Sequence, residues 1–222
     1  MTFQERVNGA GMKAECYRLL AESYYPPHQG LNKLIEDLAE LMVPMHPETA
    51  QFFQAMRLEN PSMKELIGDY SRLFLGPFDT VAPPYGSVYL DPSNGVMGSS
   101  TAHVRDYYLA SGLDISDDCG EAPDHISVEL EFMHFLCIKE AGAANEGDLE
   151  DALHFSRKQE EFIAQSMAWI HEFTERIRTR AGTAFYRGLA ECTLALISSH
   201  LGESEVGREK IAGPLEAGSS IS

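Results

Sequence analysis

The sequence predicts an all-α fold: a single-domain bundle of about eight helices with one long Pro-rich loop. Apolar residues recur almost everywhere at a spacing of three or four, which is the period of an α-helix. No alternating apolar and polar run is long enough to form a sheet. A chain of 222 residues with 44% hydrophobic content can bury one sizeable core, so one domain is expected.

Helices in the first part of the chain are delimited by prolines. They are expected over about residues 12–20, 31–42, 47–56 and 61–74. Pro26 and Pro44 end the first two of these helices. Pro47 and Pro61 open the other two, because proline suits the first helical turn, where its missing N–H costs nothing.

Capping residues and charges delimit the later helices. These are expected over about residues 99–112, 123–137, 148–180 and 184–200. Ser99 offers an N-cap and Gly112 a C-terminal stop. Pro123 opens the next helix. The helix over about residues 148–180 is expected to be continuous. Asp148 at its start and Arg180 at its end both suit the helix dipole.

The end of the chain differs in composition from the rest. We expect residues 1–201 to form the helical domain and the polar, Gly- and Ser-rich residues 202–222 to be a disordered tail. The N-terminus lacks the apolar core of a signal peptide, and no apolar run approaches the ~18 residues of a membrane span. The cysteines are far apart and form no CxxC pair, so we expect reduced thiols, a cytoplasmic location and no stable membrane insertion.

The charge of the chain limits its partners. Its 34 acidic and 17 basic residues give a formal net charge of −17. Nucleic acid is therefore excluded as a partner, because phosphate binding needs a basic face. A basic peptide, in contrast, would be attracted. Neither GxxxxGK[ST] nor GxGxxG is present at a usable place, so no nucleotide cofactor is expected.

One constellation offers a metal site as an alternative. His125 and Glu129 are four residues apart and would share a helix face, with His134 further along. Histidine and carboxylate ligands at this spacing recur in helical metalloproteins. The pattern is neither HExxH nor a repeated ExxH, and His134 lies about 100° off that face. A helical metal-binding enzyme using these three residues is thus the second hypothesis, and a helical scaffold without a binding site is the third.

The aromatic, Pro-rich stretch over residues 70–89 is the strongest functional signal. Loops this long and apolar are uncommon unless they have a task. Tyr70 and Phe74 share a helix face, whereas Tyr85 and Tyr89 follow a proline pair that stiffens the loop. These rings either close the core or offer amphipathic contact area to a peptide. We expect Tyr85 to be the docking residue and Tyr89 to belong to the core.

Several segments stand in register at the separations typical of one family. They are residues 72–77, 82–91, 98–105, 121–126 and 184–191. Together they resemble the TorD/DmsD family of cytoplasmic chaperones for molybdenum-cofactor enzymes, and its DmsD branch in particular. That branch usually has tryptophan where this chain has Tyr70, Tyr85 and Tyr89, which implies a more polar pocket.

The resemblance implies an all-helical chaperone without catalytic machinery or cofactor. Such a protein binds the twin-arginine signal peptide of a molybdoenzyme catalytic subunit and holds the apo subunit until its cofactor is loaded. Carried over by motif, the peptide-site residues are Tyr70, Leu73, Phe74, Pro84, Tyr85, Ser87, Tyr89, Asp124 and His125. Asp124 offers a carboxylate for a guanidinium. A monomer is expected, with a helix-swapped dimer as the alternative.

Overall fold

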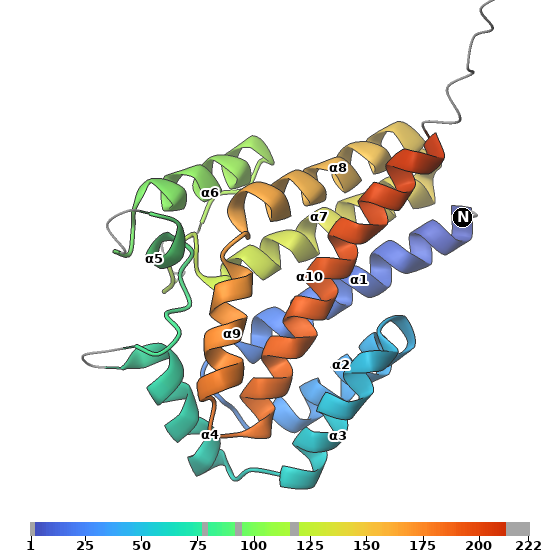
Figure 1. The fold of residues 1–222 in the computed structure, drawn as a ribbon. Helices are drawn as coiled ribbons and strands as arrows, with labels where there is room; N and C mark the ends of the chain where they lie inside the picture. The colour runs from blue at the N-terminus through green and yellow to red at the C-terminus, as the bar shows by residue number, and fades with distance from the viewer. Residues whose placement is uncertain (1–2, 77–79, 92–94, 116–119, 212–222) are drawn as a thin grey trace, which may run out of the picture.

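The chain folds into an all-α bundle, as predicted (Figure 1). The computed structural model describes residues 3–76, 80–91, 95–115 and 120–211, with side chains from residue 9 to residue 201 within those ranges. The described residues hold ten α-helices and no β-strand, against the eight or so helices expected. The elements are α1 (Phe3–Ser23), α2 (Leu31–Met45), η1 (Pro47–Thr49), α3 (Ala50–Glu59), α4 (Met63–Tyr70), η2 (Ser71–Leu75), α5 (Ser87–Leu90), α6 (Ser99–Ala110), α7 (Ile126–Glu146), α8 (Leu149–Ser166), α9 (Ile170–Arg180) and α10 (Ala184–Ile211).

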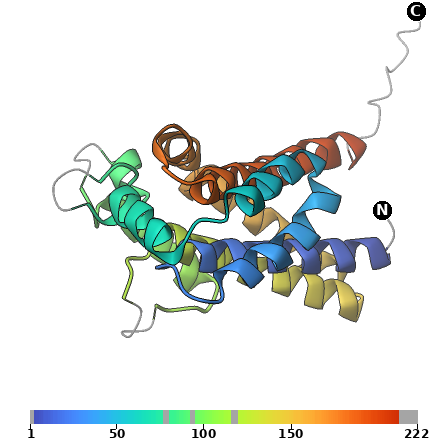
Figure 2. The same cartoon turned by 90° about the horizontal axis from the view of Figure 1, so that it is seen from below.

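Helix α1 packs mainly against α7 and α2. Helix α7 in turn packs on α8, while α10 covers α9 and α3 (Figures 1 and 2). Cys16, Tyr17 and Leu20 of α1 are fully buried. The Tyr17 hydroxyl is 2.9 Å from Nδ1 of His200, which ties α1 to α10. Burial lowers the pKa of His200 to about 3, so this imidazole stays neutral.

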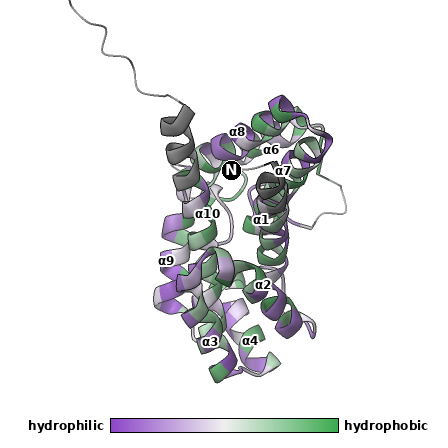
Figure 3. Cartoon of the chain, turned by 90° about the vertical axis from the view of Figure 1, so that its right-hand side faces the viewer, coloured by the Kyte–Doolittle hydropathy of each residue, from purple (hydrophilic) through white to green (hydrophobic). Residues whose placement is uncertain are grey.

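The expectation of one continuous helix over residues 148–180 is wrong. The chain breaks between α8 and α9, and α9 leaves α8 at an angle (Figure 1). Met167 and Trp169 of the connecting turn are only 1% and 2% exposed. The break carries the indole of Trp169 into the core, and this tertiary burial outweighs the local preference for a continuous helix. The outer side of α9 is hydrophilic (Figure 3).

Other helix ends differ from the expected positions. Helix α2 continues through Pro44 to Met45, and α7 begins at Ile126 instead of Pro123 because His125 is its N-cap. Helix α10 continues past the expected end near residue 200 to Ile211, so the first part of the predicted tail has a helical backbone. Residues 212–222 lie outside the described residues.

The described cysteines are buried free thiols. Cys16, Cys137 and Cys192 lie inside the bundle, and burial raises the pKa of the Cys16 thiol to about 12. Cys119 lies outside the described residues. None of the helices in the described part of the chain combines the length and the apolar character that a bilayer crossing requires.

Candidate peptide-binding site

The Pro-rich loop is fastened to the N-terminus of α7. Ile126 N donates to the Pro84 carbonyl at 2.9 Å, and Gly86 N donates to the Asp124 carbonyl at 2.9 Å. The backbone N–H of Ser87 also donates to Asp124 Oδ2 at 2.8 Å. Two segments almost forty residues apart in sequence are thereby joined, and the structure brings Pro84, Tyr85, Ser87, Asp124 and His125 together.

Aromatic rings and carboxylates meet on the outside of this junction. The Tyr85 ring meets the His125 ring edge-on at a centroid distance of 5.1 Å, and its hydroxyl donates to Glu121 Oε2 at 3.0 Å. Tyr25 stacks near His125 at 6.3 Å and donates its hydroxyl to Glu131 Oε1 at 3.0 Å. We call these five residues the Tyr85 surface. Tyr25, Tyr85 and Glu121 are half-buried, and Glu131 is exposed.

His125 is a structural member of this surface. Its side chain is the N-cap of α7, where Nδ1 accepts a hydrogen bond from Ser127 N at 3.2 Å. Burial lowers its pKa, although the nearby carboxylates of Glu121 and Asp124 act in the opposite direction. His125 is only 2% exposed, so its imidazole packs against the rings of Tyr25 and Tyr85 instead of facing solvent, and its lowered pKa favours the uncharged form.

Asp124 lies beneath the surface and is completely buried. Its Oδ2 accepts from Ser87 N, but its Oδ1 has no hydrogen-bond partner among the described residues. An unpaired carboxylate oxygen in the interior is costly, so a water or an incoming donor is needed. The loop over residues 84–87 must move before a guanidinium can reach this oxygen, and the role of Asp124 as an arginine partner stays a prediction.

A second buried carboxylate supports the loop from below. Glu129 is fully buried, accepts a hydrogen bond from Trp169 Nε1 at 3.1 Å through Oε2, and has no described partner for Oε1. Burial raises the pKa of Glu129 well above its usual value, and the charge of Asp124 adds to this effect. The shift therefore favours the neutral carboxyl form of Glu129 over the carboxylate. The same indole explains Gly86, because a Cβ there would lie 2.9 Å from Trp169 Nε1.

Three of the predicted site residues belong to the aromatic core instead of an open groove. Tyr70, Leu73 and Phe74 are 5%, 0% and 4% exposed. The Phe74 ring meets Tyr70 at 5.2 Å and Tyr186 at 5.6 Å. Ala82 N donates to the Leu73 carbonyl at 2.9 Å, which holds residue 82 against η2. In this structure the side chains of Tyr70, Leu73 and Phe74 pack in the core and do not present their surfaces to a peptide.

Tyr89 and Tyr85 pack against different residues. Tyr89 is half-buried, and its ring stacks on Trp169 at 5.3 Å. The Arg176 guanidinium lies 4.8 Å from the same ring, in a cation–π contact. Burial raises the pKa of the Tyr89 hydroxyl, which has no described hydrogen-bond partner. The two tyrosines of the loop thus contact separate parts of the bundle.

The alternative metal ligands do not converge. His125 caps α7, Glu129 binds Trp169, and His134 Nδ1 lies 2.8 Å from the Ala14 carbonyl oxygen. Within the described residues no group of three or more His, Cys, Asp or Glu side chains is arranged to hold a metal ion. The geometry gives the metal-enzyme hypothesis no support.

Sequence reasoning missed several members of the junction. Tyr25, Glu131 and Trp169 were not proposed as site residues. Tyr25 directly precedes a proline pair, which is a visible signal for an aromatic residue at a loop. Glu131 and Trp169 carry no such signal, because their roles depend on contacts across 106 and 40 residues of sequence.

Comparison with known proteins identifies the family. The model of the family described as "Nitrate reductase delta subunit" matches residues 28–175, which is more than half of the chain. The chain belongs to this family of redox enzyme maturation proteins, which includes TorD and DmsD. The resemblance to the TorD/DmsD family noted in the sequence is confirmed.

Relatives cover different shares of the chain. "Perchlorate reductase assembly chaperone protein" of Dechloromonas aromatica is 26% identical over 212 residues, which are 90% of this chain and 92% of that protein. "Chaperone protein TorD" of Vibrio parahaemolyticus is 30% identical over 61% of this chain and 62% of its own length. "Probable Tat proofreading chaperone DmsD" of Haemophilus influenzae is 27% identical over 62% of this chain and 61% of its length.

A solved structure shares the fold. The crystal structure of a "Putative Redox Enzyme Maturation Protein" from Archaeoglobus fulgidus superimposes with a TM-score of 0.51. The match covers 86% of this chain and 93% of that chain at 22% sequence identity. At this identity the likeness concerns the arrangement of the helices alone.

Proposed function

We propose that this protein is a chaperone that binds the twin-arginine signal peptide and the apo form of a molybdoenzyme catalytic subunit of the DMSO reductase superfamily. It acts in the cytoplasm and without catalysis, during cofactor insertion and before export. Family membership supports a role in redox enzyme maturation, since the named relatives are chaperones. The choice of a basic peptide as ligand rests on the chemistry of the Tyr85 surface.

The Tyr85 surface combines what a basic and apolar peptide needs. Tyrosine rings offer flat apolar contact area, and tyrosine is enriched among residues that dominate binding energies. Glu121 and Glu131 accept hydrogen bonds from tyrosine hydroxyls and keep further lone pairs for a guanidinium. The five members include no lysine or arginine, and the chain as a whole carries a net charge of −17. This pairing of aromatic faces with carboxylates is the observation that carries the proposal.

A peptide titration at two salt concentrations tests the proposal. The probe is a synthetic signal peptide with an Arg-Arg pair followed by an apolar segment, and the control peptide has Gln-Gln in place of the pair. We expect tighter binding at about 0.1 M than at about 1 M salt, because the screening length falls from about 10 to about 3 Å. We also expect weaker binding of the control peptide. Folded protein that binds neither peptide at either salt concentration refutes the proposal.

Substitution of Tyr85 locates the site. Tyr85→Ala is expected to weaken the Arg-Arg peptide by about 2 kcal/mol, or roughly thirtyfold, as for an aromatic hot spot. Tyr107→Ala is the matched control, since Tyr107 is also half-buried but contacts His103 and Phe162 on another part of the bundle. Equal losses of affinity in the two variants, or none in Tyr85→Ala, would place the peptide elsewhere.

A further inference from the structure

An apolar cleft adjoins the Tyr85 surface on the side of α6. It has a volume of about 280 Å³, and its apolar walls come from α6, the following turn and α7. These apolar lining residues are Tyr108, Leu113, Ile115, Val128 and Phe132. We call it the Phe132 cleft. An apolar cavity of about 150 Å³ accepts benzene, so this cleft is large enough for a bulky apolar side chain.

The walls of the cleft are held in place. The Tyr108 and Phe132 rings meet at a centroid distance of 4.7 Å, and the Tyr108 hydroxyl donates to the Pro123 carbonyl at 2.8 Å. Gly112, with a φ of 76°, turns the chain back after α6, and Leu113 N then donates to the Tyr108 carbonyl at 2.9 Å. Leu113 and Ile115 consequently pack against the core while remaining half exposed.

The charge at the rim of the cleft selects among occupants. Asp114 and Glu131 complete the lining. Arg105 lies 3.4 Å from Asp114 and balances one of the two carboxylates, and both of these side chains are more than half exposed. Glu131 accepts its hydrogen bond from an uncharged tyrosine. An apolar segment with positive charge beside it therefore complements the cleft, whereas an acidic segment does not.

The cleft and the Tyr85 surface are continuous through shared residues. Glu131 lines the cleft and binds the Tyr25 hydroxyl. The Tyr25 ring stacks near His125, whose ring contacts Tyr85. A ligand on Tyr85 that extends past Tyr25 thus reaches the mouth of the cleft.

We infer that the Phe132 cleft holds an apolar side chain of the segment that follows the paired arginines, while Glu121 and Glu131 face those arginines. This inference rests on the proposed function, because it assigns one part of the same peptide to a second subsite. It places the apolar contact in the cleft between α6 and α7 instead of on the buried residues Tyr70, Leu73 and Phe74.

Two peptides and two variants test the inference. One peptide contains the Arg-Arg pair and the apolar segment, and the other ends after the basic part. Ile115→Asp places a charge in the cleft and is expected to weaken the long peptide by about tenfold or more, while the affinity for the short peptide is unchanged. Leu149→Asp is the matched control, because Leu149 is 53% exposed at the start of α8 and lies outside the lining. It is expected to change neither affinity.

The outcomes separate the inference from the function on which it rests. Wild-type protein that binds neither peptide refutes the function itself. If Ile115→Asp leaves the affinity for the long peptide intact while Tyr85→Ala lowers it, the cleft assignment is overturned and the function stands. Wild-type protein that is a dimer by light scattering, and becomes monomeric in Ile115→Asp, would show that a second copy of the chain covers the cleft, which also overturns the assignment.

A cross-linking experiment on the wild-type protein covers the case in which Ile115→Asp does not fold. The long peptide carries a benzophenone at its first bulky apolar position, and the cross-linked residues are mapped by mass spectrometry. Attachment at Leu113, Ile115 or Phe132 is expected. Attachment on the far side of the junction, at Tyr89 or Arg176, would overturn the assignment.

Discussion

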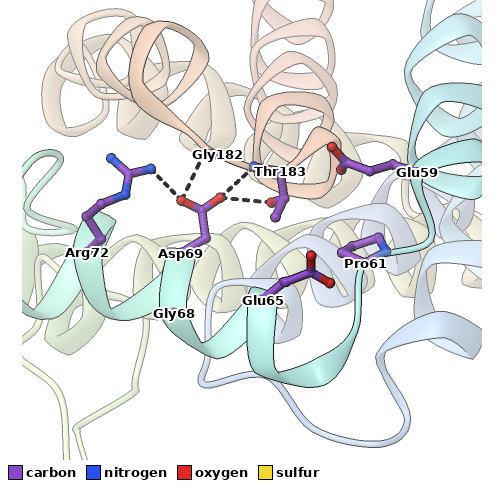
Figure 4. A pocket seen from close by; sticks show the side chains of 8 residues that line it. All are labelled: Glu59, Pro61, Glu65, Gly68, Asp69, Arg72, Gly182 and Thr183. Atoms are coloured by element: carbon purple, nitrogen blue, oxygen red, sulfur yellow. Dashed lines mark hydrogen bonds and ion pairs between the residues drawn. The ribbon is translucent and has the colours of Figure 1, made fainter.

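The buried carboxylates of this bundle have two contrasting kinds of surroundings. Asp69 on α4 accepts hydrogen bonds from Gly182 N, Thr183 N, the Thr183 hydroxyl and the Arg72 guanidinium, at 2.5 to 3.0 Å (Figure 4). Asp124 and Glu129 at the junction each accept one hydrogen bond, from Ser87 N and Trp169 Nε1, and each has one oxygen without a partner among the described residues. We call Asp69 together with its donors Arg72, Gly182 and Thr183 the Asp69 anchor, and Asp124 together with Glu129 the Asp124–Glu129 cluster.

The pKa values reflect this difference. Burial acts to raise the pKa of Asp69, but the hydrogen bonds from Gly182, Thr183 and Arg72 prevail and lower it. Burial dominates at Glu129, where one bond from Trp169 does not compensate, so its pKa rises. The Asp69 anchor is satisfied within the chain. It borders a cavity of about 340 Å³ whose lining comes from the end of α3, the connection to α4, α4 itself, η2 and the turn before α10. Within the described residues, Asp124 and Glu129 each receive fewer hydrogen bonds than Asp69 does.

Removal of Asp69 is expected to have the largest effect on stability. Asp69→Ala leaves two backbone N–H groups and a hydroxyl without their acceptor and should lower the free energy of unfolding by about 3–5 kcal/mol. Urea unfolding at pH 7 measures the loss. Asp37→Ala is the control, because Asp37 forms only a surface ion pair with Lys33 and should change stability by about 1 kcal/mol or less. Equal losses in the two variants would contradict the role of Asp69 as an anchor.

The Asp69 anchor also predicts a loss of stability in acid. Since its folded-state pKa is lowered, Asp69 contributes stability above its unfolded value near 3.8, and that contribution disappears as the pH falls through the folded value. His200 also lowers stability in acid, but this effect begins at a higher pH. Its pKa is about 3 in the folded chain and 6.5 in the unfolded chain, so below pH 6.5 the unfolded chain binds a proton that the folded chain does not.

Asp124 is expected to have an intermediate effect, divided between stability and binding. Asp124→Asn keeps an acceptor for Ser87 N, so the fold should persist with a loss of about 1 kcal/mol. Affinity for the Arg-Arg peptide should fall by about 1–3 kcal/mol if a guanidinium reaches the carboxylate. Asp106→Asn, on the exposed side of α6, makes the same charge change as a control. Unaltered affinity in Asp124→Asn would restrict the arginine contacts to Glu121 and Glu131.

The sequence predicted the fold better than it predicted the site. Prolines and capping residues mark most helix ends, and their effects are local, so α2, α3, α4 and α6 lie close to their expected ranges. The break before α9 was missed because no glycine or proline marks it. Its cause is the burial of the Trp169 indole, which donates a hydrogen bond to Glu129, 40 residues away in sequence.

Within the candidate site, proximity was predictable but exposure was not. The motifs that contain Tyr85 and Asp124 were expected to act together, and the structure joins them. Tyr70 and Phe74 were expected to contact a peptide, yet they pack in the aromatic core. An apolar helix face has the same periodicity whether it meets the core or a ligand, so the pattern cannot distinguish the two.

Glu129 is expected to show a pH-dependent effect on stability, with the opposite sign to that of Asp69. The pKa of Glu129 is higher in the folded chain than in the unfolded chain, where it is near 4.5. Above pH 4.5 the unfolded chain therefore releases a proton that the folded chain keeps, and stability declines as the pH rises toward the pKa of the folded chain. Glu129→Gln retains an oxygen acceptor for Trp169 Nε1 and has no proton to lose. The variant should therefore equal the wild type in stability near pH 4.5 and become more stable than it as the pH rises above that value, as measured by urea unfolding at each pH. Glu146→Gln, at the other end of α7 about 25 Å away along the helix, is the matched control and should follow the wild type at every pH. A Glu129→Gln variant that is less stable than the wild type at pH 8 would mean that Glu129 is ionised and needed as a charge, which would make the Asp124–Glu129 cluster a second anchor like Asp69.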